Sequence, residues 1–126
     1  MSVFERIRRD IPVGTPLKTP VRNKPFTIER YEPNAVVFSV GVNHLPIPVP
    51  RACWDGIPDF LRGKPWVRIG SKHDVAEKGT LEEYLDTHQN PHQHRHPSWG
   101  SYVVPVLEHL GIVEVDHCTP SKVRLK

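Results

Sequence analysis

Residues 79–126 decide the fold, and they read GTLEEYLDTHQNPHQHRHPSWGSYVVPVLEHLGIVEVDHCTPSKVRLK. Near the start of this stretch, Thr80 is followed three residues later by Glu83, which is the spacing of a capping box. In that motif the threonine hydroxyl accepts a hydrogen bond from a backbone N–H of the first helical turn, and the glutamate reaches back. We therefore predict a short helix over residues 81–87.

A second helix is predicted between positions 98 and 110, because apolar residues recur there at helical spacing. They are Tyr102, Val103, Val106, Leu107 and Leu110. Gly111 follows at the position where a helix end favours a residue with positive φ. Ser98 and Ser101 are both candidate N-caps, and Pro105 is tolerated better if Ser101 is the cap, since it then falls near the first turn.

A β-hairpin is predicted at the end of the chain. Residues 112–115 are rich in β-branched side chains, and residues 122–126 alternate strictly between apolar and basic. Val123 and Leu125 share one face of the second strand, and Lys122, Arg124 and Lys126 share the other. The two strands should pair antiparallel across a turn that contains Pro120.

A helix and a short strand are predicted just upstream, over residues 50–62 and 65–70. Gly56 and Pro58 lie inside the helix, so we expect a break near Gly56. The elements of residues 49–126 then follow in the order helix, strand, helix, helix, strand, strand. In this order, and in the GTLEEYL and YVVPVLEHLGIVEV stretches, the chain resembles the winged helix-turn-helix superfamily. The fold class expected is therefore α/β (α+β).

The resemblance implies binding to double-stranded DNA, with the third helix in the major groove and the hairpin, or wing, along the backbone. Carried onto this chain, the groove-facing residues would be Arg95, Ser98, Trp99, Ser101 and Tyr102. The phosphate contacts of the wing would come from Lys122, Arg124 and Lys126.

One departure from the superfamily pattern leaves a second function open. Residues 98–110 contain Glu108 and lack the Lys and Arg side chains that commonly read base edges. Trp99 and Tyr102 are equally well explained as core or interface aromatics. The alternative is a protein-interaction or dimerisation module of winged-helix fold without DNA binding. A homodimer would suit both functions.

The N-terminal segment, residues 1–25, is predicted to be a basic, proline-rich arm. Residues 1–30 hold seven basic and three acidic side chains, whereas the rest of the chain is nearly neutral. Residues 1–9 could form a short amphipathic helix, and residues 10–25 are expected to lack regular structure. The arm would give DNA-backbone contacts from Arg6, Arg8 and Arg9, although a solvated tail explains the same composition.

Residues 26–48 are predicted to form a β-hairpin extension. Residues 26–31 alternate, residues 32–34 form a turn, and residues 35–42 are a nearly continuous apolar run, which predicts a strand buried on both faces. The three prolines of residues 44–50 suggest a connection to the next helix rather than a strand.

Histidines are concentrated in residues 88–96. His92, His94 and His96 alternate, so an extended segment would place them on one side, where they could bind a transition metal. No cysteine lies nearby in the sequence to complete a structural zinc site, although His117 and Cys118 in the wing turn could in principle join, and a solvated loop is the favoured interpretation. We expect no cofactor and no enzymatic activity, since the chain has no G-x-S-x-G, H-E-x-x-H or P-loop motif.

Composition sets the remaining limits. The chain has 126 residues, of which 37% are hydrophobic, and no apolar run approaches the roughly 18 residues that span a bilayer. The start of the chain lacks the apolar core of a signal peptide. Its two cysteines, Cys53 and Cys118, are far apart, which favours reduced thiols. A cytoplasmic protein without membrane contact is therefore expected.

Overall fold

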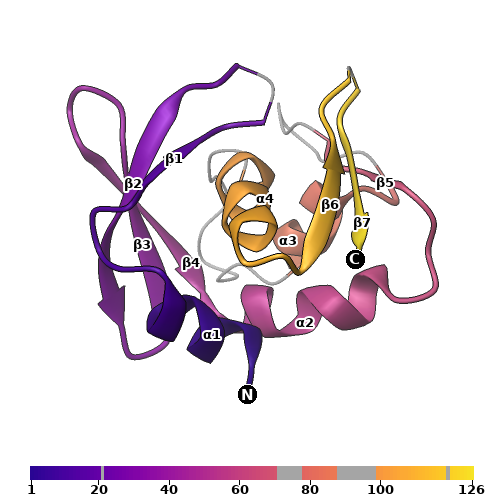
Figure 1. The fold of residues 1–126 in the computed structure, drawn as a ribbon, viewed down its shortest axis with the longest axis horizontal. Coiled ribbons are helices and arrows are strands. Elements are labelled where there is room, and N and C mark those ends of the chain that lie inside the picture. Colours follow the sequence, from indigo (N-terminus) through magenta and orange to yellow (C-terminus); the bar gives the residue numbers. More distant parts are fainter. Residues whose placement is uncertain (21, 71–77, 88–98, 119) are drawn as a thin grey trace.

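The computed structural model describes residues 1–20, 22–70, 78–87, 99–118 and 120–126. These residues form a mixed α/β structure with two antiparallel sheets and four helices (Figure 1). The helices are α1 Val3–Asp10, α2 Arg51–Leu61, α3 Leu81–Thr87 and α4 Gly100–His109. The strands are β1 Pro16–Lys18, β2 Pro25–Glu32, β3 Ala35–Val40, β4 Leu45–Pro50, β5 Val67–Arg68, β6 Val113–Asp116 and β7 Lys122–Leu125.

The predicted N-terminal hairpin is present as β2 and β3, but it forms the centre of a four-stranded sheet of order β1-β2-β3-β4. Val36, Val37 and Phe38 in β3 are each at most 1% exposed, which confirms a strand buried on both faces at these positions. A bulge between Ile28 and Arg30 changes the alternation of β2. Tyr31 consequently packs toward the core.

The interpretation of residues 44–50 as a connection was wrong, because Leu45–Pro50 forms strand β4 along the whole of β3. The strand tolerates Pro46, Pro48 and Pro50 because they occupy alternate positions at the sheet edge. A proline nitrogen has no hydrogen to donate, so these three must face away from β3 and leave the ladder to the residues between them. The free edge of β4 thereby lacks N–H donors at three positions, which discourages pairing with another strand.

The expectation that residues 10–25 lack regular structure was also wrong. Pro16–Lys18 forms β1 and pairs antiparallel with β2, with Leu17 opposite Phe26. A proline can begin an edge strand because its missing donor is not needed there. Leu17 is 8% exposed, and burial of its side chain favours the docking of this short strand on β2.

The C-terminal part of the fold agrees closely with the prediction. β6 and β7 pair antiparallel, with Val115 opposite Val123 and Val113 opposite Leu125. β5 pairs with β7 from the other side, so the second sheet has the order β5-β7-β6. From Arg51 onward, the helices and strands that the structure describes follow the predicted order helix, strand, helix, helix, strand, strand.

Local capping explains where α3 begins. The Glu83 N–H donates to Thr80 Oγ1 at 3.2 Å, and Glu83 Oε1 accepts from the Gly79 N–H at 3.0 Å. The capping box predicted from Thr80 and Glu83 is therefore confirmed, as are the bounds of the helix.

Helix α2 differs from the prediction, because it runs without a break through Gly56 and Pro58. Its apolar face holds the helix in the core: Cys53, Trp54 and Ile57 are 0% exposed. Burial of that face outweighs the single backbone hydrogen bond that Pro58 removes.

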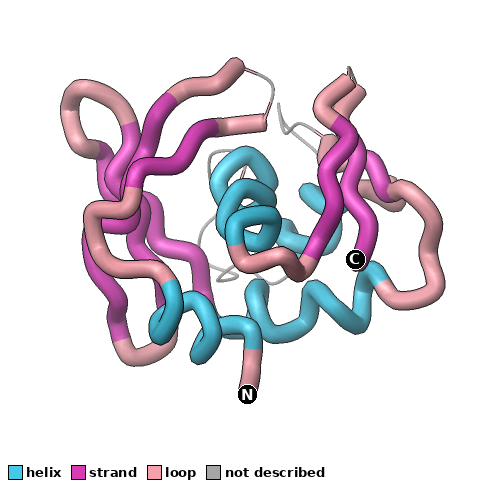
Figure 2. The backbone as a smooth tube through the Cα atoms, in the orientation of Figure 1, coloured by secondary structure: helices cyan, strands magenta, loops and turns pink. Residues whose placement is uncertain are grey.

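The helices and sheets of the described residues share one hydrophobic core. Val3, Phe4, Ile7 and Ile11 from the predicted arm join a cluster that also contains residues of both sheets and of α2, α3 and α4. Figure 2 shows α1 and α2 lying along one side of the two sheets, with α4 between the sheets. Among the described residues, no helix has the length and apolar character needed to cross a membrane.

Candidate functional site

Helix α4, the predicted DNA-reading helix, lies between the two sheets (Figure 1). On one side Tyr102 packs edge-on against Phe26 of β2, with ring centroids 5.2 Å apart, and lies 6.1 Å from Phe38 of β3. Val103, Val104, Val106 and Leu107 are 0% exposed. A helix covered on opposite sides has little surface left to enter a major groove.

The residues predicted to face the DNA groove differ in how deeply they are buried. Trp99 is 2% exposed and belongs to the core, whereas Tyr102 and Ser101 are half-buried. Arg95 and Ser98 lie outside the described residues. The sequence left open whether Trp99 and Tyr102 are core or interface aromatics. In the structure Trp99 is a core residue.

The start of α4 is capped by a group that the sequence did not indicate. Ser101 lies inside the helix and is not its N-cap, and Ser98 is outside the described residues; the helix begins at Gly100, and Trp99 at the N-cap position makes no side-chain hydrogen bond to it. Instead, the carboxylate of Glu82 in α3 accepts the Trp99 N–H at 3.1 Å and the Gly100 N–H at 2.9 Å. Glu82 is 0% exposed, and a negative charge is favoured at a helix N-terminus. This buried carboxylate fixes α3 against α4.

The cations of the predicted arm belong to a docked helix. The Arg6 Nη2 donates to the Leu110 carbonyl at 3.3 Å, at the end of α4, and Arg9 pairs with the neighbouring Asp10 at 2.6 Å. Arg8 is exposed. Only part of the predicted phosphate-binding charge of α1 is thus directed to solvent.

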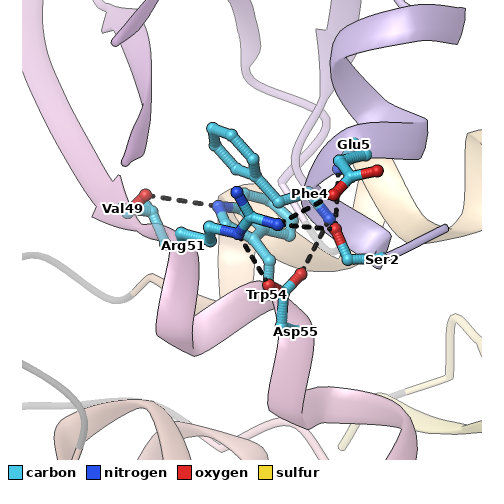
Figure 3. A network of polar contacts seen from close by, with 7 residues as sticks. All are labelled: Ser2, Phe4, Glu5, Val49, Arg51, Trp54 and Asp55. Carbon is cyan, nitrogen blue, oxygen red and sulfur yellow. Dashed lines mark hydrogen bonds and ion pairs between the residues drawn. The ribbon is translucent and has the colours of Figure 1, made fainter. Parts of the chain in front are cut away.

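A polar network joins the start of α1 to α2 (Figure 3). Asp55 accepts the Phe4 N–H at 3.0 Å, and Arg51 links Asp55 at 2.9 Å to Glu5 at 3.0 Å. The Arg51 guanidinium also lies 5.1 Å from the centre of the Phe4 ring and donates to the Ser2 hydroxyl. The network satisfies N–H groups at the N-terminus of α1 and holds the helix in place.

The basic face of the wing is partly neutralised. Arg124 forms an ion pair with Glu114 at 2.8 Å and lies over the Trp66 ring at 4.4 Å, and Lys122 lies opposite Asp116. Lys126 is exposed. In Figure 1 the β6–β7 turn, which precedes Lys122, and α1 lie at opposite ends of the molecule. Lys126 lies nearer to α1, since its N–H donates to the Ile112 carbonyl at 3.0 Å, two residues after the Leu110 carbonyl that Arg6 reaches.

A second basic group lies beside that turn. Lys18 at the end of β1 and Arg22 and Lys24 on the β1–β2 connection are all exposed, and no acidic residue occurs between Ile11 and Ile28. The connection touches the β6–β7 turn through His117, whose Nδ1 is 3.1 Å from the Pro20 carbonyl oxygen.

His117 also contacts helix α4. Its Nε2 lies 3.1 Å from Glu108 Oε2. A carbonyl and a carboxylate can only accept, so both ring nitrogens must donate, and only the imidazolium can do so. Hydrogen bonds to the Pro20 carbonyl and then to Glu108 accordingly raise the pKa of His117. The β6–β7 turn, the β1–β2 connection and α4 are joined at this ring.

An apolar cavity opens on the other side of the β1–β2 connection. It has a volume of about 530 Å³ and lies between that connection, the β3–β4 turn and Tyr102 of α4. Phe26 and Val40 supply apolar walls, and Val42, which is 94% exposed, projects at the rim. Leu45, at the start of β4, is 58% exposed. Concave apolar surface with exposed apolar side chains beside it is typical of a binding site.

A family profile matches residues 9–126 of the chain, which is all of it except the greater part of α1. The chain belongs to DUF6855. This is a family of unknown function. Searches for similar curated proteins and for similar solved structures give no significant match.

In this DUF6855 protein, the Cys53 thiol is not placed to act as a nucleophile. Cys53 is 0% exposed, and burial raises the pKa of its thiol to about 12, so it remains a neutral packing group. The candidate metal ligands His92, His94 and His96 lie outside the described residues. Among the residues that are described, no cluster of His, Cys, Asp and Glu could hold a metal ion.

Sequence reasoning missed the cavity of the DUF6855 fold because its walls come from distant segments. Phe26 and Tyr102 are 76 positions apart in the sequence and meet only when the first sheet packs on α4. The basic residues around Lys24 were counted in the N-terminal charge, but nothing in their spacing placed them beside the wing. The sequence signal that could have been used is Val42, an apolar residue in a segment of turn composition, GVNH.

Proposed function

We propose that this protein is a winged-helix interaction module that associates through the β3–β4 face and does not read DNA with α4. The element order from Arg51 onward and the sheet order β5-β7-β6 support the winged-helix arrangement. The interaction function is supported by the position of α4, which is covered by a sheet on either side.

The observation that carries the proposal is the exposed apolar surface at the β3–β4 turn. Val42 and Leu45 are 94% and 58% exposed, and the cavity lies next to them. Exposing such side chains together is unfavourable unless a partner covers them. A second copy of the chain is the partner proposed, because in a two-fold dimer one apolar patch meets its own equivalent.

Sedimentation equilibrium over a wide range of protein concentration tests this association. The wild-type chain should shift from monomer to dimer as concentration rises, and the double substitution Val42→Ser with Leu45→Ser should remain monomeric. Val13→Ser is the matched control, since Val13 is 56% exposed but lies after α1, away from the turn. A wild-type chain that stays monomeric throughout, or a control that weakens association equally, would refute the proposal.

DNA binding remains a second candidate, favoured by the exposed cations of the β1–β2 connection. Lys18 and His117 line one hollow, and His117 joins the β1–β2 connection to the turn that leads into Lys122. These side chains could bind phosphates without inserting a helix in a groove. Double-stranded DNA would then be bound with little sequence preference.

Fluorescence anisotropy with a random DNA duplex tests the second candidate. Binding should be present at about 50 mM salt and fall steeply by about 200 mM. Lys18→Glu should abolish it, whereas Arg8→Glu on α1 should have a smaller effect, because α1 lies at the far end of the molecule. Lack of binding at the lower salt concentration would exclude phosphate-driven binding by these turns.

We also propose a cytoplasmic location. Cys53 and Cys118 are both free, which suits a compartment that keeps thiols reduced. Mass spectrometry of alkylated thiols in freshly lysed cells would show oxidised Cys118 if the location were an oxidising one.

A further inference from the structure

The cavity beside Tyr102 carries an inference that goes beyond self-association. Its volume, about 530 Å³, is within the range of small-molecule sites, which extends from about 300 to 1,000 Å³. Its walls combine aromatic rings with a few polar groups, which is also usual for such sites. We propose that the cavity binds a small aromatic monocarboxylate.

The aromatic part of the ligand follows from the rings at the cavity wall. Phe26 is 3% exposed and meets Tyr102 edge-on with an interplanar angle of 82°. Tyr102 is half-buried, so part of its ring is free for a planar ligand ring to stack on or to meet edge-on, and Phe26 supports that ring from behind. Val40 adds an aliphatic side chain to the same wall.

The carboxylate follows from the charges at the cavity. Lys24 and His44 line it, and no Asp or Glu does so among the described lining residues. An anionic group would therefore meet an ammonium and an imidazole without repulsion from a carboxylate. A cationic ligand would lack a counter-charge in the lining.

Local hydrogen bonds order the two rims of the cavity. The Lys24 N–H donates to Thr19 Oγ1 at 3.0 Å, and the Thr19 N–H donates to the Lys24 carbonyl at 3.0 Å, which closes the turn. On the opposite rim, Ser39 Oγ and His44 Nδ1 are 3.2 Å apart. Burial raises the pKa of the Tyr102 hydroxyl, which therefore stays protonated and able to donate a hydrogen bond.

Titration of the full chain with 2-naphthoate, followed by isothermal calorimetry and by amide chemical shifts, tests the proposal. The uncharged analogue 2-naphthamide has the same ring system and serves as the charge control. Naphthoate should bind with shifts confined to the cavity residues, and it should bind about three- to tenfold more tightly than the amide. Equal binding of the two compounds, or no saturable binding, would overturn the proposal.

Matched variants locate the site. Lys24→Met should reduce naphthoate affinity to that of the amide, whereas Lys126→Met, an equally exposed lysine at the chain end, should leave it unchanged. Val40→Phe should fill the cavity and weaken both compounds, because Val40 pairs with Phe26 and shares its face of the sheet, and an aromatic side chain suits a strand position. Naphthoate affinity that survives both Lys24→Met and Val40→Phe would place the ligand elsewhere.

The same spectra separate this inference from the proposed dimer. Cavity shifts that grow with protein concentration alone, and that exclude naphthoate, would show that a second copy fills the cavity, and the ligand proposal would fail. Naphthoate binding by the monomeric Val42→Ser, Leu45→Ser variant would support the ligand site even if self-association were absent.

Discussion

Glu82 is a carboxylate that is 0% exposed, and it accepts two backbone N–H groups at the N-terminus of α4. Gly100, the first residue of the helix, makes the close approach practicable: a Cβ there would lie 3.0 Å from Glu82 Oε2 and 2.9 Å from Ile69 Cγ2. A single acidic side chain thus replaces the hydroxyl cap that either serine was expected to provide.

We predict that Glu82→Gln lowers the free energy of unfolding by about 1–3 kcal/mol, since the charge is lost and the amide presents an N–H₂ group toward a backbone donor. Urea unfolding followed by tryptophan fluorescence measures the change. Glu83→Gln is the control, because Glu83 is half-exposed and accepts one exposed bond from Gly79. Equal losses in the two variants would argue against the capping role of Glu82.

His117 provides a pH-dependent contribution at the same scale. Its pKa is raised in the folded chain, so its contribution to stability is complete below the unfolded pKa of about 6.5 and is lost as pH rises through the folded pKa. Asp116 also faces the ring and acts in the same direction as Glu108. His117→Gln should therefore destabilise the protein more at mildly acidic pH than at mildly alkaline pH.

Parallel urea titrations of wild type and His117→Gln at several pH values measure this difference. The effect should be within about 1 kcal/mol, because the side chains of His117 and Glu108 are 53% and 43% exposed. Glu108→Gln should reduce the pH dependence as well, since it removes the negative charge that faces the ring. A His117→Gln effect that is constant across pH would show that the imidazolium is not formed.

Helix α2 shows how an element can retain residues that its own propensity disfavours. A Cβ at Gly56 would lie 2.1 Å from the Tyr84 hydroxyl, which donates to the Cys53 carbonyl at 3.3 Å. The Tyr84 ring also stacks on Phe60, with centroids 4.7 Å apart. Glycine is therefore required for packing between α2 and α3, rather than marking a break in the helix.

We predict that Gly56→Ala destabilises the fold, although glycine to alanine in a helix interior usually stabilises by about 0.5–1 kcal/mol. In a Tyr84→Phe background the clash with the hydroxyl is gone, so the same substitution should cost less. Urea unfolding of the two single variants and the double variant gives the coupling energy. Additive effects would mean that Tyr84 does not contact Gly56.

Elements with local signals were predictable, and elements that depend on distant partners were not. Helix α3 could be bounded from Thr80 and Glu83 because a capping box acts within one turn. Strand β4 was missed because three prolines argue against a strand unless its position at a sheet edge is known. The packing of the first sheet on α4 was missed because it also depends on distant residues. Nothing near Tyr102 in the sequence indicates that Phe26 packs against it.

At the scale of the whole molecule, the structure changes the role of the N-terminal segment. The sequence shows proline and positive charge, which predict an arm, yet Phe4 and Ile7 are 1% and 0% exposed in the common core. Tyr31 of β2 reaches the same helix, since its hydroxyl lies 2.6 Å from the Ile11 carbonyl oxygen. Whether α1 belongs to the folding unit is a question that local sequence cannot answer, because the contacts are with α2 and β2.

Phe4→Ala should therefore destabilise the entire protein, by about 3–5 kcal/mol, as expected for removal of a large buried side chain. An undocked arm would give no change, so the two interpretations differ by several kcal/mol in a single urea titration. Arg8→Ala on the exposed side of the same helix is the control and should stay within about 0.5 kcal/mol of wild type. Amide hydrogen exchange extends the test, because a docked α1 should exchange through the same global opening as α2 and β2. Fast exchange of α1 with unchanged stability in Phe4→Ala would restore the arm, and with it the DNA-binding role of Arg6, Arg8 and Arg9.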